Sequence, residues 1–129
     1  MALPYKPDHI HLRSPDPIAA ASFYVDALGA REVTRMDVRG ALRIILDLGG
    51  LRLFVEQVPT TTQRAPEPPY VGIEHIGLAV DDLDAAVADL RARGANFVVE
   101  PREARPGVRI AFFEAPDRVR IELIERKAT

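Results

Sequence analysis

An alternation of apolar and polar residues opens each half of the chain. Residues 9–13 (HIHLR) and 74–80 (EHIGLAV) alternate in the way of a half-buried β-strand. An Ala-rich segment follows each of them, and we expect helices over residues 17–28 and 83–93. Each predicted helix has an N-capping aspartate before it and a glycine after it, namely Asp16 and Gly29 in the first half and Asp82 and Gly94 in the second.

Three further strands are expected after each predicted helix, because short apolar stretches there are separated by turn sequences. The turns are DVRG and LGG in the first half and EARPG and APDR in the second. The predicted strands cover residues 31–36, 42–47, 51–58, 96–100, 109–114 and 119–125. Each half thus has the order βαβββ, and we predict an α+β fold in which two such units form a curved mixed sheet.

The two halves are expected to be copies of one unit. Residues 8–59 align with residues 74–125 at a constant shift of 66 and without a gap. Between them, residues 60–72 contain three prolines, and because proline fixes φ and lacks the N–H, we expect an extended linker there. We therefore predict a single domain over residues 1–129, built from two repeat units and one linker.

Two pairs of polar residues coincide in this repeat. His9 aligns with His75 and Glu56 with Glu122, and the histidine match carries weight because the chain has only 3 histidines. The histidines open each unit and the glutamates lie in its closing strand, among apolar residues where an unpaired carboxylate is costly to bury. If a pseudo-twofold axis relates the units, two imidazoles and two carboxylates meet in one cleft of the sheet. Such a ligand set suits Zn, Fe, Ni, Mn or Co and leaves positions for water or substrate, so we predict a divalent metal site.

Other side chains share the strand faces of these residues. Because side chains alternate along a strand, His11 and Arg13 lie on the face of the first histidine, and Phe54 lies on the face of the first glutamate. A histidine near a strand end, such as His11, is equally compatible with contact to a substrate and with plain solvation. We expect Glu114 and Glu125 to be solvated.

Composition removes several classes of protein. The chain has 129 residues, of which 47% are hydrophobic and 28% charged, as in an ordinary globular protein. A net charge of −2 gives no basic surface for nucleic acid, and no apolar run is long enough for a membrane helix. Cysteine is absent, which excludes disulfides, thiolate metal sites and a cysteine nucleophile. No signal peptide is visible, and a cytoplasmic location is expected.

Three stretches of the chain resemble the vicinal oxygen chelate superfamily, which includes glyoxalase I, bleomycin resistance proteins and extradiol dioxygenases. DHIHLRSPDPIAAASFYVDALGA is similar to the opening of glyoxalase I, and EHIGLAVDDLDAAVADLRARGA to the opening of a second module. IAFFEAPDRVRIELIE is similar to the closing stretch, in which the family usually has DPDG where this chain has APDR. The resemblance covers nearly the whole chain and implies a glyoxalase-like fold.

The resemblance also implies roles for the repeated residues. Its ligand positions fall on His9, Glu56, His75 and Glu122, and the last of these corresponds to a ligand that also acts as general base in glyoxalase I. The stretch LRLFVEQVP can be shifted so that Phe54 takes the ligand position instead, which leaves two histidines and one glutamate. The gap-free repeat favours the glutamate.

Two further features bear on the substrate. Arg13 matches an arginine that resembles a contact to the carboxylate of glutathione, whereas the Asn-Trp-Gly segment of glyoxalase I is replaced here by QVPT. His11 adds a third imidazole to the same face, where it would contact the substrate or transfer a proton.

Three functions follow from the resemblance. The first is a metal-dependent lyase or isomerase that stabilises the enediolate of a small oxo or hydroxy compound. The second is an extradiol-type Fe(II) dioxygenase, in which two histidines and Glu122 form a facial triad. The third is a metal-free antibiotic-binding protein of the bleomycin resistance kind, which the absence of tryptophan and the low aromatic content of 6% disfavour. The resemblance further implies a homodimer, whose formation would cover exposed strand edges.

Overall fold

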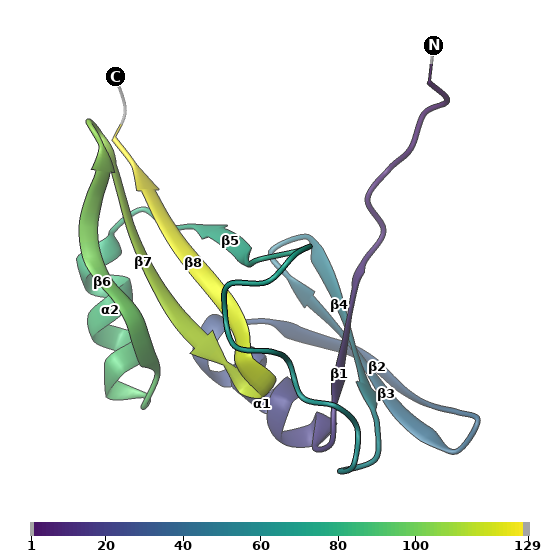
Figure 1. The fold of residues 1–129 in the computed structure, drawn as a ribbon. Helices are drawn as coiled ribbons and strands as arrows, with labels where there is room; N and C mark the ends of the chain where they lie inside the picture. The colour runs from purple at the N-terminus through teal and green to yellow at the C-terminus, as the bar shows by residue number, and fades with distance from the viewer. Residues whose placement is uncertain (1, 128–129) are drawn as a thin grey trace. The chain divides into compact units, whose positions relative to one another are not determined.

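The computed structural model describes residues 2–127, and the chain divides between Gln63 and Arg64 into two compact units. We call residues 1–63 the first unit and residues 64–129 the second unit. Each contains one α-helix and one four-stranded sheet (Figure 1).

The first unit has the order βαβββ that the sequence predicts. Its sheet has the strand order β1-β4-β3-β2, in which β1 and β4 are parallel and the other neighbours are antiparallel. The elements are β1 (Ile10–Ser14), α1 (Pro17–Leu28), β2 (Arg31–Val38), β3 (Ala41–Leu48) and β4 (Leu51–Gln57).

The second unit repeats this topology. Its strand order is β5-β8-β7-β6, with β5 parallel to β8. The elements are β5 (Ile76–Ala79), α2 (Leu83–Ala92), β6 (Asn96–Arg105), β7 (Val108–Ala115), the short 3₁₀ helix η1 (Pro116–Arg118) and β8 (Val119–Arg126). The α+β class and the duplicated βαβββ order are therefore confirmed.

One strand differs clearly from its prediction. β6 was expected to end at residue 100, but it continues to Arg105, so the predicted turn EARPG lies mostly within the strand. Pro101 lies within the strand although proline has no N–H and cannot donate to a ladder. It is tolerated because β6 is an edge strand, and its pairing with β7 shifts register around that residue.

Both helices begin and end at the predicted residues or one residue away. The carboxylates of Asp16 and Asp82 accept hydrogen bonds from the amides of Ala19 and Ala85, at 3.1 and 3.0 Å. Gly29 follows α1 with φ of 74°, in the left-handed region where glycine carries no steric cost.

A second carboxylate, that of Glu125, caps the N-terminus of α2, which differs from the prediction for this residue. Glu125 was expected to be solvated, yet its side chain is only 16% exposed and its Oε2 accepts a hydrogen bond of 2.7 Å from the amide of Leu83. The free amides at a helix N-terminus attract a carboxylate, which explains why Glu125 is held there.

The core of each unit lies between its helix and one face of its sheet. α1 packs on β3 and β4, and α2 packs on β6, β7 and β8 (Figure 1). The buried side chains are Tyr24, Ile44, Leu46, Leu53 and Val55 in the first unit and Leu83, Leu90, Phe113, Ile121 and Leu123 in the second. The opposite face of each sheet is therefore the one that carries the candidate polar residues.

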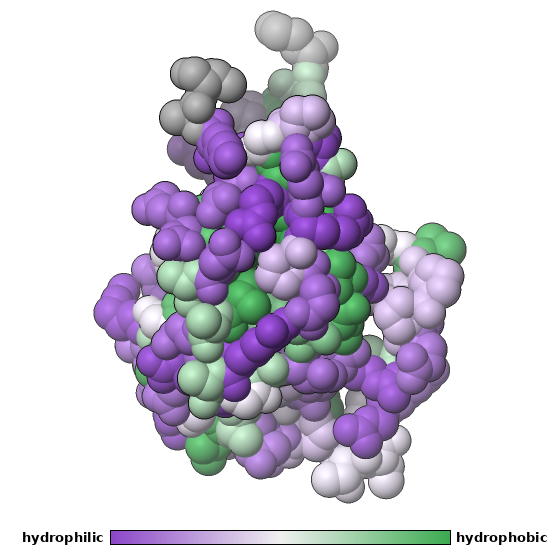
Figure 2. All heavy atoms as spheres, turned by 90° about the vertical axis from the view of Figure 1, so that its left-hand side faces the viewer, coloured by the Kyte–Doolittle hydropathy of each residue, from purple (hydrophilic) through white to green (hydrophobic). Residues whose placement is uncertain are grey.

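The surface contains both hydrophilic and hydrophobic residues, as the composition indicates. Figure 2 shows a face on which hydrophilic side chains predominate and hydrophobic ones are scattered among them. Within residues 2–127, the helices are too short or too polar to cross a membrane.

Candidate functional site

In the first unit, β1 and β4 bring two histidines beside two residues of the closing strand. The parallel register pairs His11 with Phe54 and Arg13 with Glu56. The ring of His9 stacks on the ring of Phe54, with centroids 3.8 Å apart and planes 4° apart. The first predicted ligand thus contacts an aromatic ring of β4, and its Nδ1 lies 2.6 Å from a carboxylate oxygen of Asp8.

Glu56 is held by cations of its own unit. Its Oε1 accepts hydrogen bonds from Nη2 and Nε of Arg43, at 2.6 and 3.2 Å, and lies 3.3 Å from Nε2 of His11. Hydrogen bonding to Arg43 lowers the pKa of the Glu56 carboxyl, and the charges of Arg43, His11 and Arg13 lower it further. The carboxylate is therefore ionised and already partnered at neutral pH.

This depressed pKa makes a prediction about stability in acid. A carboxyl group whose pKa is lower in the folded state stabilises the fold above its unfolded pKa of about 4.3 and loses this contribution as the pH falls through its folded pKa. We expect Glu56→Gln to destabilise the protein at pH 7, and the difference from the wild type to shrink as the pH is lowered from about 5 to 2. Urea unfolding across this pH range measures the effect. A Glu103→Gln control changes an exposed carboxyl, and an equal response in both variants would contradict the assignment.

In the second unit, His75 and Glu122 form a direct imidazole–carboxylate pair. Nε2 of His75 lies 3.4 Å from Oε1 of Glu122, and the two side chains are 28% and 17% exposed. The imidazole also meets the edge of the Phe112 ring at a centroid distance of 5.0 Å. Gly77 lies opposite Glu122 in the β5–β8 ladder, and its missing side chain leaves that side of the carboxylate open.

The strand register shows which residue of the first unit corresponds to Glu122. His11 and Gly77 are 66 residues apart and hold the same place in the repeat, but the ladder partner of His11 is Phe54 whereas the ladder partner of Gly77 is Glu122. Phe54 and Glu122 are 68 residues apart, so the gap-free shift of 66 does not hold in the closing strands. Phe54 is therefore the structural counterpart of Glu122.

The lengths of the turns explain part of this displacement. Two glycines, Gly49 and Gly50, connect β3 to β4, whereas the three residues of η1 connect β7 to β8. The longer turn moves β8 by one residue relative to β4, and the other residue is inserted before β7. Glu56 accordingly lies beside Arg43, while the place that matches Glu122 holds an aromatic ring.

The predicted site residues are thus brought together in two groups. In the first unit, Phe54 lies beside the rings of His9 and His11, and His11 contacts Glu56, whose ladder partner is the exposed Arg13. In the second unit, His75 and Glu122 contact each other. Within residues 2–127, three or more histidine, aspartate or glutamate side chains do not gather in a metal-binding arrangement.

Two arginines beside the candidate site residues were not predicted from the sequence to belong to the site. Arg43 binds Glu56, and Arg120 lies over the Phe112 ring, with its guanidinium carbon 4.8 Å from the ring centroid. The repeat aligns Arg43 with Arg109, and this match drew attention to the residue. Only the pairing of β3 with β4 shows that Arg43 lies opposite Glu56. Arg120 was visible two residues before Glu122, on the same strand face.

Comparisons with known proteins cover both units. The family model described as Glyoxalase/Bleomycin resistance protein/Dioxygenase superfamily matches residues 6–123. The uncharacterized proteins YwkD of Bacillus subtilis and YaeR of Escherichia coli are each 32% identical to the chain, over 92% of it and 94% of their own length. A probable lactoylglutathione lyase of Synechocystis is 29% identical, over 91% of this chain and 92% of that protein.

Solved structures support the fold. A glyoxalase family protein from Enterococcus faecalis superposes with a TM-score of 0.78 at 23% identity, over 91% of this chain and 94% of that one. The fosfomycin resistance protein FosX from Listeria monocytogenes superposes with a TM-score of 0.77 at 17% identity, over 97% and 96%. At such identities the likeness concerns the arrangement of helices and strands.

Proposed function

Because this chain belongs to the Glyoxalase/Bleomycin resistance protein/Dioxygenase superfamily, we propose that it is a metal-dependent lyase or isomerase acting on a small oxo or hydroxy compound. The observation that carries the proposal is the half-buried pair of His75 and Glu122 beside the open position at Gly77. Relatives named as probable lactoylglutathione lyases support the same class of reaction.

The donor groups fit a divalent metal ion. The imidazole and carboxylate of the second unit lie side by side, and each keeps part of its surface open to solvent. We assign the ligands to His9, His75 and Glu122, while Glu56 stays bound to Arg43. A metal ion held by such ligands supplies a Lewis acid for the oxygens of the substrate.

Glu122 is the proposed general base. Its carboxylate is the acid nearest to the open position at Gly77, where a substrate carbon would approach. Phe112 supports the neighbouring imidazole by edge contact, which fixes the orientation of the pair. In this scheme His11 and Arg13 contact the substrate from the first unit, and Phe54 supports the ring of His9.

One observation favours a second candidate function, an extradiol-type Fe(II) dioxygenase. Since Phe54 takes the place that matches Glu122, the assigned ligands are two histidines and one carboxylate. That is the composition of the facial triad of non-haem Fe(II) oxygenases.

A loading and turnover experiment tests both candidates. The protein is loaded with Ni, Zn, Mn or, without oxygen, Fe(II), and bound metal is measured by elemental analysis. Each form is then offered the hemithioacetal of methylglyoxal and glutathione, acyl-CoA thioesters, and catechol with oxygen. We expect about one ion per chain. Turnover of a thioester or hemithioacetal supports the lyase or isomerase, and ring cleavage of catechol supports the dioxygenase. A protein that binds none of these metals would contradict both.

The ligand assignment predicts unequal effects of two glutamates. We expect Glu122→Ala to weaken metal binding by at least about tenfold, because a ligand is lost, and Glu56→Ala to change it by less than about threefold. Competition with a metal-sensitive dye measures both affinities. An equal loss in the two variants would show that Glu56 is also a ligand and would contradict the three-residue set.

A homodimer belongs to the same proposal. The edge strands of the two sheets carry backbone groups without a strand partner in their own sheets, and association of two copies is one way to cover such edges; these strands are β1, β2, β5 and β6. Sedimentation equilibrium tests it, since a mass near twice 14.2 kDa is expected.

A further inference from the structure

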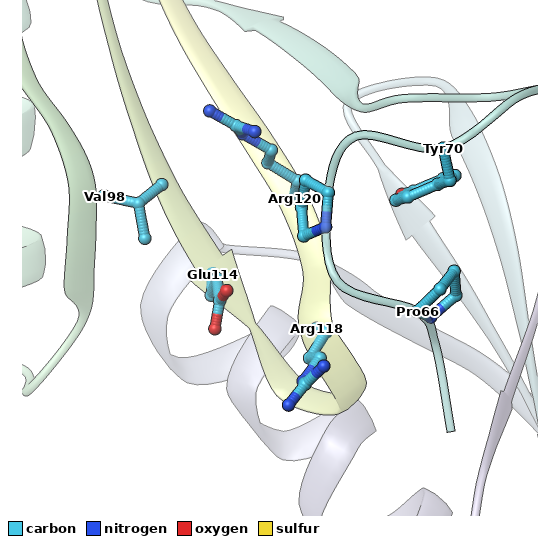
Figure 3. A pocket seen from close by; sticks show the side chains of 7 residues that line it. Pro66, Tyr70, Val98, Glu114, Arg118 and Arg120 are labelled. Carbon is cyan, nitrogen blue, oxygen red and sulfur yellow. The ribbon is translucent and has the colours of Figure 1, made fainter. Parts of the chain in front are cut away.

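The second unit contains a pocket whose lining includes Arg120, two residues before Glu122 in β8. Its volume is about 280 Å³, and residues of β6, β7, η1, β8 and the segment 66–70 line it. Figure 3 shows Arg120 and Glu114 on the strands and Arg118 in the turn that joins them, with Pro66 and Tyr70 on the preceding segment. The volume suits a small ligand.

Of the two arginines in this pocket, Arg118 is already occupied. Its Nη1 lies 2.9 Å from Oε1 of Glu67 and donates to the carbonyl of Ala65 at 3.3 Å. These contacts tie the segment before Tyr70 to the turn between β7 and β8. Arg118 therefore builds the wall of the pocket.

Arg120 keeps an unused hydrogen-bonding edge. Its Nη1 forms an ion pair with Oε1 of Glu74 at 3.7 Å, while its Nε is buried without a hydrogen-bond partner among the described residues. The guanidinium lies over the Phe112 ring, which restricts its motion. A buried charged donor without a partner is costly, and a carboxylate can satisfy Nε and one Nη together.

The negative charge of Glu114 bears on which anion this pocket would bind. It is the ladder partner of Arg120 and lines the same pocket, so its negative charge opposes a dianion more strongly than a monoanion. A carboxylate is therefore favoured over a phosphate.

We propose that Arg120 binds a carboxylate of the substrate in this pocket, so that the substrate is a hydroxy or oxo acid with a second, distal carboxylate. Arg120 and Glu122 are two residues apart on one face of β8, about 6.6 Å along the strand. The reacting oxygens would lie at Glu122 and the distal carboxylate at Arg120. The inference rests on the proposed function for the first of these positions, and on the pocket alone for the second.

The pocket is tested first in metal-free protein. Arginine ¹⁵Nε–¹H resonances are followed by NMR during titration with butyrate and, separately, inorganic phosphate, and Arg120 is assigned by its absence in Arg120→Gln. We expect the Arg120 signal to shift with butyrate and much less with phosphate. No shift with butyrate, or a larger one with phosphate, overturns the proposal whether or not the protein binds metal.

The second test uses metal-loaded protein and two acids of equal chain length. By calorimetry, 2-hydroxyglutarate is expected to bind at least about tenfold more tightly than 2-hydroxyvalerate, which lacks the distal carboxylate; this corresponds to ~1.4 kcal/mol. Arg120→Gln should reduce the ratio to about one, and Arg120→Lys, which cannot form the bidentate contact, should reduce it in part. The control Arg102→Gln removes an exposed arginine of β6 and should keep the full ratio.

The two tests separate the proposals. A chain that takes up no metal contradicts the proposed function, while the NMR titration still decides the role of Arg120. Equal affinities for the two acids in metal-loaded wild-type protein overturn the distal-carboxylate inference and leave the metal-dependent reaction standing.

Discussion

Glu122→Gln is expected to lower turnover by roughly 10²–10⁴-fold without unfolding the protein, the range that a general base contributes. Glutamine has the size of glutamate but cannot accept the substrate proton, and it also replaces the carboxylate that lies 3.4 Å from His75. The variant is measured by kcat/KM on the substrate that the turnover screen identifies, with circular dichroism to verify the fold.

A matched control separates this effect from a loss of charge. Glu103→Gln makes the same chemical change at an exposed position of β6 and should retain full activity. Full activity of Glu122→Gln would contradict its role as base. A loss of activity that parallels a loss of bound metal would assign Glu122 to metal binding alone.

The order of elements was predictable because local signals agree with tertiary structure. Asp16 and Asp82 satisfy the first amides of their helices, and the glycines after them allow the chain to leave the helix. These interactions involve residues only a few positions apart, so the sequence contains all that is needed to recognise them.

For the site, alternation along a strand predicts only which residues of that strand share a face. Alternation places His9 and His11 on one face of the first strand, whereas the approach of their rings to Phe54 depends on the pairing of β1 with β4. The choice between Phe54 and Glu56 depends on ladder register, which is set by the length of turns elsewhere in the unit. A gap-free repeat conceals such a change, because one inserted residue per turn leaves most neighbouring matches plausible.

Contacts between a side chain and residues of another strand or helix could not be predicted either. Glu125 looks like a solvated end of β8, yet it binds the amide of Leu83, which is 42 residues away in the chain. Arg43 and Arg120 likewise acquire their roles from partners on neighbouring strands or rings. Long-range contacts of this kind follow from the packing of the sheet and helix.

Phe113→Ala is expected to cost about 3–5 kcal/mol of unfolding free energy, the largest effect on stability that we predict. Phe113 of β7 is fully buried and contacts the ring of Phe97, with centroids 5.5 Å apart. Truncation removes its contacts with the core beneath α2 and leaves a cavity that the surrounding strands can fill only in part.

Urea unfolding followed by circular dichroism measures this cost, and two further variants locate its origin. Val98→Ala removes an exposed side chain of the neighbouring strand β6 and should change stability by less than about 0.5 kcal/mol. A double-mutant cycle of Phe97→Ala and Phe113→Ala should give a coupling of about 0.5–1.5 kcal/mol if the rings interact directly. A cost below about 1 kcal/mol for Phe113→Ala would contradict its place in the core, since burial and cavity formation both act against the smaller residue.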